Sequence, residues 1–333
     1  MTVTQTSARA APRSGWLLAV GVLGLAVAGY LSLAIGVGGV GMRGLVTPTA
    51  DEWHILLQSR IPRLLAVLLA GSALAVAGLV MQRITQNRFV SPSTSGTTEA
   101  AILGVLVATL VFGDQALAIR MLIAIVFAVI GTFGFLRLVN RVHSTDGLAV
   151  ALIGLMYGGV IGAVATAIAY RTDLLQFLEM WTAGSFSGVL AGRFEPLLLV
   201  APVTVLAYLY ADRFTVVGMG HSFATNLGVD YHRVRAIGLF TMSVTAAVMV
   251  VVVGALPFLG LIVPNLVSMA LGDNMRRVLP VTALAGAAFV LACDVAGRLI
   301  RYPYEVSAST LIGLIGGAVF IVLILRVTRG LPA

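Results

Sequence analysis

Long apolar stretches alternate with short polar stretches along the whole chain. Each apolar stretch holds about 15 to 22 residues, and a helix of roughly 20 apolar residues can cross the hydrocarbon of a membrane. The third and eighth stretches are short for a full crossing, so nine spans is the alternative count. The pattern predicts an all-α polytopic membrane bundle of about ten transmembrane helices, at residues 15–36, 61–82, 98–113, 117–136, 148–169, 195–211, 236–254, 257–271, 279–297 and 307–326.

The start of the chain differs from the remainder. Residues 1–14 are polar and rich in Ser, Thr and Arg, and the apolar stretch after them has no cleavage site of the signal-peptide kind. We therefore expect a cytoplasmic tail at 1–14, followed by a retained first helix. Since no low-complexity linker divides the remainder, residues 15–333 are expected to form a single transmembrane domain.

Composition narrows the class of protein. Hydrophobic residues make up 59% of the 333 residues and charged residues only 10%, with a mean hydropathy of +1.03. All 21 basic residues are Arg, so the chain lacks the Lys with which a P-loop binds terminal phosphates. The four His and the single Cys show no metal-ligand spacing. We predict a membrane protein that does not hydrolyse ATP by that route and has no metal or cofactor of its own.

Arginine distribution predicts the orientation. With an even number of spans and a cytoplasmic N-terminus, 13 of the 21 arginines fall on the cytoplasmic side and eight on the other. Cytoplasmic loops of membrane proteins carry this excess. The net charge of +8 is therefore a topology signal and does not indicate nucleic acid. We expect both termini in the cytoplasm of a multi-pass inner-membrane protein surrounded by lipid.

Five ordered motifs carry a family resemblance. They are RIPR at 60–63, QRITQNRFVSP at 82–92, GALPFLGLIVPN at 254–265, RRVLP at 276–280 and LACDVAGRLI at 291–300. In this order and spacing they resemble the iron-siderophore and cobalamin ABC importer permeases over residues 55–326. The NRFVSP version, followed by Thr97, Thr98 and Glu99, looks like the subgroup associated with catecholate siderophores.

The resemblance implies a fold and a set of partners. It implies the fold of a type II ABC importer permease that translocates ferric siderophores. Partners would be a second permease subunit, with a heterodimer favoured over a homodimer, two ATPase subunits that bind ATP and Mg²⁺, and an extracytoplasmic substrate-binding protein. Haem or cobalamin remains the alternative cargo within the family.

Arginines mark the predicted outer face. Arg60 and Arg63 lie one helical turn apart before the second span and would project a pair of positive charges outward. The resemblance implies that this pair, with Arg298, receives Glu side chains of the substrate-binding protein. Snorkelling of the arginines to the membrane interface is the alternative. Asp294 precedes Arg298 by four residues, a spacing that favours an ion pair within one helix.

Polar residues at the predicted inner face resemble the family's cytoplasmic gate. The gate candidates are Asn87, Phe89, Ser144, Thr145 and Asp146. Ordinary turn and cap chemistry is the alternative, because Ser, Thr, Asn and Asp favour such positions. Arg88 and Phe89 depart from the Pro and Leu that are usual in the family.

Glu99 is a pathway candidate at the start of the third span. A carboxylate at membrane depth costs about 2.5 to 3.5 kcal/mol on insertion scales, so it should face a wet cavity or a partner. A position shallow enough for hydration is the alternative.

Two long loops are expected to fold into short helices. The predicted outer loop at 170–194 could form an interfacial helix, and the inner loop at 212–235 resembles the family's ATPase-coupling segment. A solvated charged surface is the alternative for the second loop. The coupling candidates are Gly220, His221, Ala224, Leu227, Gly228 and Val229.

Two other classes of protein fit less well. A secondary transporter driven by an ion gradient would want ionisable residues deep in several spans, and only Glu99 and Asp294 qualify. A membrane enzyme would need a nucleophile and a base, and no such constellation is present.

Overall fold

The computed structural model describes residues 14–36, 41–113, 117–142 and 147–328, and these residues form helices and no strand. The predicted tail at 1–14 falls almost entirely outside them. The elements are α1 (Ser14–Ala34), α2 (Met42–Val46), α3 (Ala50–Ile55), the π-helix η1 (Leu56–Arg60), α4 (Ile61–Thr85), α5 (Thr97–Phe112), α6 (Leu117–Val142), α7 (Gly147–Arg171), α8 (Leu175–Thr182), the 3₁₀-helix η2 (Glu195–Leu199), α9 (Val200–Leu209), α10 (Ala211–Val217), α11 (His221–Asn226), α12 (Tyr231–Val252), α13 (Leu259–Leu271), α14 (Met275–Ile300) and α15 (Ala308–Thr328).

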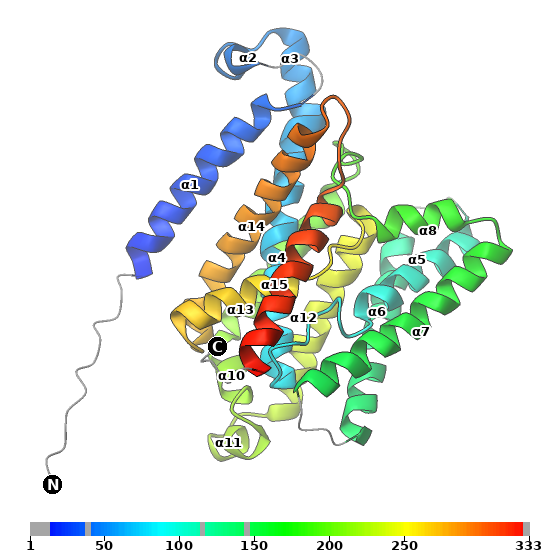
Figure 1. The fold of residues 1–333 in the computed structure, drawn as a ribbon, viewed down its shortest axis with the longest axis vertical. Coiled ribbons are helices and arrows are strands. Elements are labelled where there is room, and N and C mark those ends of the chain that lie inside the picture. The colour runs from blue at the N-terminus through cyan, green and yellow to red at the C-terminus, as the bar shows by residue number, and fades with distance from the viewer. Residues whose placement is uncertain (1–13, 37–40, 114–116, 143–146, 329–333) are drawn as a thin grey trace, which may run out of the picture.

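Helix α4 lies at the centre of the molecule, with α12, α13 and α14 around it (Figure 1). Two glycine contacts bring its backbone against its neighbours. Gly71 faces Gly286 of α14 and Gly78 faces Gly260 of α13, and a Cβ added to Gly71 or Gly78 would overlap the partner's backbone. Small residues at such crossings let helices approach closely without a gap. They explain how the apolar sequence of α4 becomes the buried centre.

Helix length supports fewer spans than the ten predicted from hydropathy. Six helices of the described chain are long and apolar enough to cross a membrane, and the pair Glu195–Leu209 and Ala211–Val217, bent by 61°, would be a seventh. Three further stretches form shorter apolar helices, at Leu18–Ala34, Thr97–Phe112 and Leu259–Leu271. The predicted all-α membrane fold is confirmed, whereas length and composition alone give six or seven full crossings.

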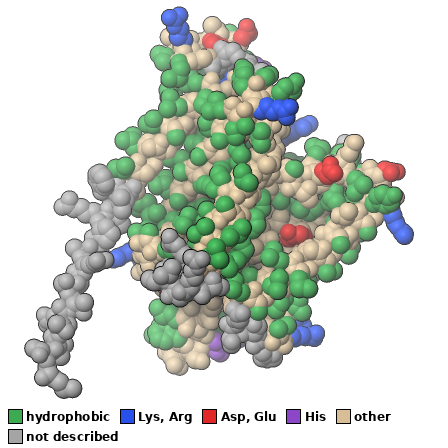
Figure 2. Space-filling view, in the orientation of Figure 1, with side chains coloured by type: hydrophobic (Ala, Val, Ile, Leu, Met, Phe, Trp, Pro, Cys, Tyr) green, Lys and Arg blue, Asp and Glu red, His purple; other side chains and the backbone are tan. Residues whose placement is uncertain are grey.

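Peripheral helices expose their apolar side chains. In the helical stretch Ala50–Thr85 and in α12, 72% of the most apolar 18-residue stretch is buried. The same share is 33% in α6 and 28% in α7 and α15. Hydrophobic side chains accordingly cover much of the visible surface (Figure 2). Such large apolar areas need a lipid or protein cover.

Two segments without regular helix run through the interior. Residues 86–96 connect α4 to α5, and residues 253–258 connect α12 to α13. Their backbone groups are bonded to other parts of the chain: the Asn87 N–H donates to the Gln82 carbonyl at 3.0 Å, and the Ala255 N–H donates to the Trp181 carbonyl at 2.9 Å. Irregular backbone at membrane depth is tolerated only when it is buried in protein or lines a cavity.

The two ends of the bundle carry different elements. Helices α2 and α3 lie at one end, and α10 and α11 lie at the opposite end (Figure 1). The short helix α8 forms within the loop at 170–194, where the sequence predicts one.

Candidate functional site

Three predicted docking residues, Arg60, Arg63 and Arg298, meet at the end of the bundle that carries α2 and α3. They line a polar cavity of about 150 Å³ together with Asp294 and Glu305. Arg63 donates through Nη2 to Asp294 Oδ1 at 2.7 Å and through Nη1 to Glu305 Oε1 at 2.9 Å. Arg298 Nη2 lies 2.8 Å from Asp294 Oδ2, so the predicted ion pair within one helix is confirmed. Arg63 and Arg298 therefore share the two carboxylates, and Arg60 lies beside them in the same cavity.

The arginines do not project outward as the sequence suggested. Arg60 is only 8% exposed and Arg298 only 5%. The cause is α1, whose last carbonyls lack partners within their own helix. Arg60 Nη1 donates to the Leu33 carbonyl at 2.7 Å, and Arg298 Nη1 donates to the Ser32 and Ile35 carbonyls at 3.0 and 2.6 Å. The end of α1 therefore covers two of the three guanidinium groups.

At the opposite end, Asn87 fixes the turn that follows α4. Its Nδ2 donates to the Gly147 carbonyl at 2.9 Å, and its Oδ1 accepts from the Phe89 N–H at 2.9 Å. Gly147 is the first residue of α7. The remaining gate candidates, Ser144, Thr145 and Asp146, lie outside the described residues.

Phe89 belongs to an aromatic cluster that no sequence motif indicates. Its ring meets that of Phe320 edge-on at 6.2 Å between centroids, and Phe320 stacks on Phe258 at 6.0 Å. The three rings come from residues 86–96, from 253–258 and from α15. No local pattern relates them, because the segments are distant in the sequence.

A line of hydroxyl groups holds the 86–96 segment in the core. Ser95 bonds Thr97 at 2.9 Å, Thr97 bonds Thr132 at 2.8 Å, and Thr132 bonds Ser243 at 2.9 Å. These bonds connect the segment to α6 and α12. They satisfy polar groups that would be costly to bury alone.

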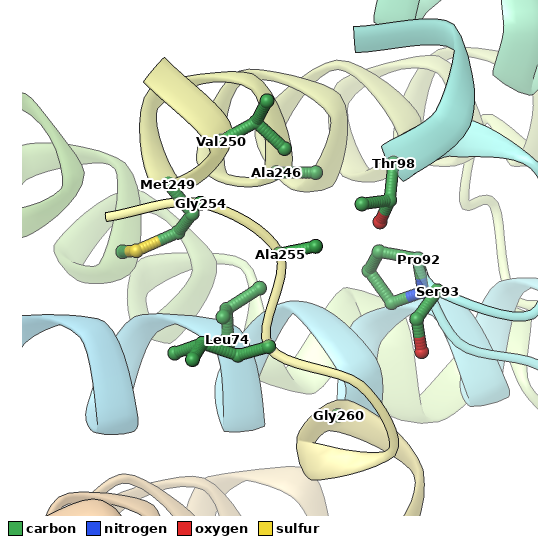
Figure 3. A pocket seen from close by; sticks show the side chains of 11 residues that line it. Leu74, Pro92, Ser93, Thr98, Ala246, Met249, Val250, Gly254, Ala255 and Gly260 are labelled. Carbon is green, nitrogen blue, oxygen red and sulfur yellow. The ribbon is translucent and has the colours of Figure 1, made fainter. Parts of the chain in front are cut away.

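The two irregular segments face each other across a small pocket (Figure 3). Pro92, Ser93 and Thr98 approach from one side, and Gly254 and Ala255 approach from the other. The pocket volume is about 10 Å³, which leaves the two segments in close proximity. The two segments therefore lie on opposite walls of one small pocket.

Glu99 lies in the first turn of α5, against α7. A Cβ on Gly158 of α7 would be 3.2 Å from Glu99 Oε2. That oxygen is buried and has no hydrogen-bond partner among the described residues. Burial by a neighbouring helix disfavours the alternative of a shallow, hydrated carboxylate.

The predicted coupling candidates fold into the short helix α11 and the turns around it. Gly220 and Gly228 take positive φ angles of 112° and 73°, which glycine adopts without a steric penalty. Ala224 is buried, and the Val229 N–H donates to its carbonyl at 3.0 Å. The exposed residues of this region include Leu227 and His221.

Polar contacts join α10 to the ends of α4 and α14. Gln86 Nε2 donates to the Val217 carbonyl at 3.4 Å, and the Met275 N–H donates to Thr215 Oγ1 at 3.2 Å. Arg83 of α4 binds Asp273 in the turn before α14 at 2.7 Å. The region around α10 and α11 is thus connected to the turn that holds Asn87.

Comparisons with known proteins place these features in a family. The FecCD transport family model matches residues 24–326. The petrobactin import system permease YclN of Bacillus subtilis is 44% identical over 91% of this chain and 96% of its own, and the ferric-anguibactin transport system permease FatD of Vibrio anguillarum is 40% identical over 84% and 90%. A solved structure described as a metal-chelate type ABC transporter in an inward-facing conformation has a TM-score of 0.76 and 27% identity, covering 94% of this chain and 99% of that one. The resemblance drawn from the ordered motifs is confirmed: the chain belongs to the FecCD transport family.

Proposed function

We propose that this chain is the permease subunit of an ABC importer for ferric siderophores, of the catecholate type. The observation that carries the proposal is its identity of 40% or more, over most of its length, with permeases named for petrobactin and ferric anguibactin. The chain supplies the path, and partner ATPase subunits supply the energy, because it has no Lys for a P-loop.

The orientation follows from arginine distribution. Seven long spans, with the bent pair counted as one, and the three shorter apolar helices would together make ten spans, with both termini in the cytoplasm of the inner membrane. The end that carries Arg60, Arg63 and Arg298 then faces outward, and α10 and α11 face the cytoplasm.

Docking would use the arginine cluster. Acidic side chains of the substrate-binding protein would bind Arg60, Arg63 and Arg298. Since Asp294, Glu305 and the carbonyls of α1 occupy these groups in the isolated chain, docking requires an exchange of partners. Charged groups across an interface mainly set its register and the association rate, which suits a partner that docks and releases repeatedly.

The cargo would pass between this chain and a second permease subunit. A second subunit of different sequence, which makes a heterodimer, is favoured over a second copy of this chain. The exposed apolar faces of α6, α7 and α15 offer surface for that subunit and for lipid. Asn87 and Phe89, with Ser144, Thr145 and Asp146, would narrow the cytoplasmic mouth. Glu99 would line the path, where an unpaired carboxylate can meet water or cargo.

Force would enter through the coupling region of α10 and α11. Its contacts with Gln86 and Met275 would pass a movement of the ATPase subunits to the ends of α4 and α14. A small rigid element can transmit such motion as one body.

Reconstitution tests this function. The chain is purified with its co-expressed permease, ATPase and binding-protein partners, placed in liposomes, and assayed for ATP-dependent uptake of ferric catecholate siderophores, haem and cobalamin. We expect uptake of a ferric siderophore. Uptake of haem or cobalamin without uptake of any siderophore would overturn the proposed siderophore cargo. Uptake driven by an ion gradient in liposomes that contain only this chain would overturn the ABC mechanism.

A further inference from the structure

We propose that Phe258 and Phe320 complete the gate predicted at Phe89, so that the three rings form an aromatic latch that closes the path in the described conformation. The inference rests on the proposed function and deepens it. Neither Phe258 nor Phe320 belongs to the gate residues implied by the family resemblance. The latch joins three separate parts of the chain through ring contacts of 6.0 and 6.2 Å.

The backbone at Phe258 takes an unusual conformation to place its ring. Phe258 has a φ of 61°, one of three positive values among the non-glycine residues described. A bulky side chain rarely occupies this region, and such outliers persist where the surrounding structure fixes them. Here the residue ends the irregular segment 253–258 and begins α13, and its ring stacks on Phe320 with 29° between the planes.

Helix α15 is shaped to receive this segment. Gly313, Gly316 and Phe320 follow each other at intervals of three and four residues and so share one helix face. A Cβ on Gly313 would lie 3.4 Å from Pro257, and a Cβ on Gly316 would lie 2.8 Å from the Cβ of Phe258. The two glycines therefore make room for Pro257 and Phe258, and Phe320 caps the contact with its ring.

Phe89 brings the other irregular segment to the same point. Asn87 accepts from the Phe89 N–H and donates to Gly147, so the latch is connected to the start of α7. All three rings are only partly buried in the single chain. Each therefore keeps surface that can face the path or a second permease subunit.

The physical role follows from chemistry and position. A constriction of apolar rings blocks a water-filled path by dewetting, without a charged barrier. Because Phe320 contacts rings on both irregular segments, a shift of α15 against residues 253–258 would separate the rings and open the path. Phe320 is thus the moving part of the latch, and Phe258 is its fixed stop.

The first experiment removes the ring of Phe320. The complete importer is reconstituted in liposomes, and two rates are measured for a ferric catecholate chelate: ATP-driven uptake and passive entry without nucleotide. We expect Phe320→Ala to raise passive entry at least fivefold and Phe320→Leu to raise it less. The matched control is Phe240→Ala, which removes an exposed ring on α12 outside the three-ring cluster and should leave both rates unchanged.

The second experiment displaces Phe258 and keeps all three rings. Gly316→Ala inserts a methyl group against Phe258, whereas Gly317→Ala adds one where nothing lies within 4 Å. We expect passive entry to rise for Gly316→Ala and to stay at the wild-type rate for Gly317→Ala. This pair keeps the test valid if Phe320→Ala fails to assemble.

The outcomes separate the latch from the proposed function. If the wild-type complex shows no ATP-driven uptake of any ferric chelate, the proposed function fails. If the wild type imports the chelate, and Phe320→Leu and Gly316→Ala both assemble and remain as impermeable without ATP as the wild type, the latch is overturned and the import function stands.

Discussion

Arg63 and Asp294 lie 231 positions apart in the sequence, yet Nη2 of Arg63 is 2.7 Å from Oδ1 of Asp294. The same carboxylate binds Arg298, and Arg63 also reaches Glu305. These bonds join α4, α14 and the segment before α15 at one end of the bundle. The side chain of Asp294 is only 2% exposed, and its negative charge compensates the buried guanidinium group of Arg298 and the partly buried one of Arg63.

Removing the charge of Asp294 should destabilise the protein strongly. Breaking a buried ion pair leaves an uncompensated charge and typically costs about 3 to 5 kcal/mol. We therefore expect Asp294→Asn to lower the unfolding temperature of the purified complex markedly. The control is Asp273→Asn, because the Asp273 side chain is 62% exposed and an exposed pair contributes only about 0 to 1 kcal/mol. Equal unfolding temperatures for the two variants would show that the cluster does not stabilise the fold.

The docking role is better tested at Arg63 than at Arg60. Arg60 is buried and bonds α1, so reversing its charge would disturb folding as well as docking. We expect Arg63→Gln, in which Asp294 keeps Arg298 as a partner, to weaken binding of the substrate-binding protein at least tenfold, measured on equal amounts of folded reconstituted complex, with a smaller dependence of association rate on salt.

A nearby exposed arginine provides the control. Arg301 lies outside the cluster and packs over the Tyr304 ring at 5.8 Å. Binding measured by surface plasmon resonance should be nearly unchanged for Arg301→Gln. If both variants bind the partner as tightly as the wild type, Arg63 has no part in docking.

Some of the structure could be predicted from the sequence because its cause is local. Apolar stretches predict the approximate helix positions. The four-residue spacing predicts the ion pair of Asp294 with Arg298. The short helices expected in the loop at 212–235 form as α10 and α11, and Gly220 and Gly228 take positive φ angles in the turns around α11.

The remainder depends on contacts between distant segments. Burial of Arg60 and Arg298 follows from the position of the α1 end, which no helical pattern specifies. The stacking of Phe258 on Phe320 likewise needs α15 to cross residues 253–258. Hydropathy also cannot separate a short buried helix such as α13 from a full span, which is why helix length supports fewer crossings than ten.

Glycine contacts at α4 predict a pair of opposite outcomes. Gly78→Ala would force a methyl group into the backbone of Gly260, and overpacking of this kind costs about 1 to 3 kcal/mol. Gly159→Ala on α7 meets nothing within 4 Å and should be neutral or slightly stabilising, because Ala favours helix more than Gly. Thermal unfolding of both purified variants distinguishes them. A Gly78→Ala protein as stable as wild type would mean that α4 and α13 pack less closely than described.

Glu99 should affect transport and not folding. Burial of an unpaired carboxylate is unfavourable, so Glu99→Gln should leave the unfolding temperature equal or higher. If the carboxylate lines the path, ATP-driven uptake should fall severalfold while ATPase activity continues. Glu179→Gln, at an exposed site on α8, is the control for loss of one negative charge. Unchanged uptake in Glu99→Gln would remove this residue from the path.

A charge exchange tests how force reaches the gate. Arg83 and Asp273 connect the end of α4 to the turn before α14. The first residue of α14, Met275, donates its N–H to Thr215 of α10. Because the pair is partly exposed, Arg83→Asp should leave folding nearly intact. We expect its ATP hydrolysis to continue while uptake falls at least fivefold, since the coupling region would lose the ion-pair link to α4 and keep the longer bond from Gln86 to the Val217 carbonyl. The double variant with Arg83→Asp and Asp273→Arg restores an opposite-charge pair and should recover at least half of the uptake. If the single and double variants both assemble and uptake stays low in the double variant, the ion pair does not link the coupling region to α4. The identity of the side chains at positions 83 and 273 would then matter for another reason.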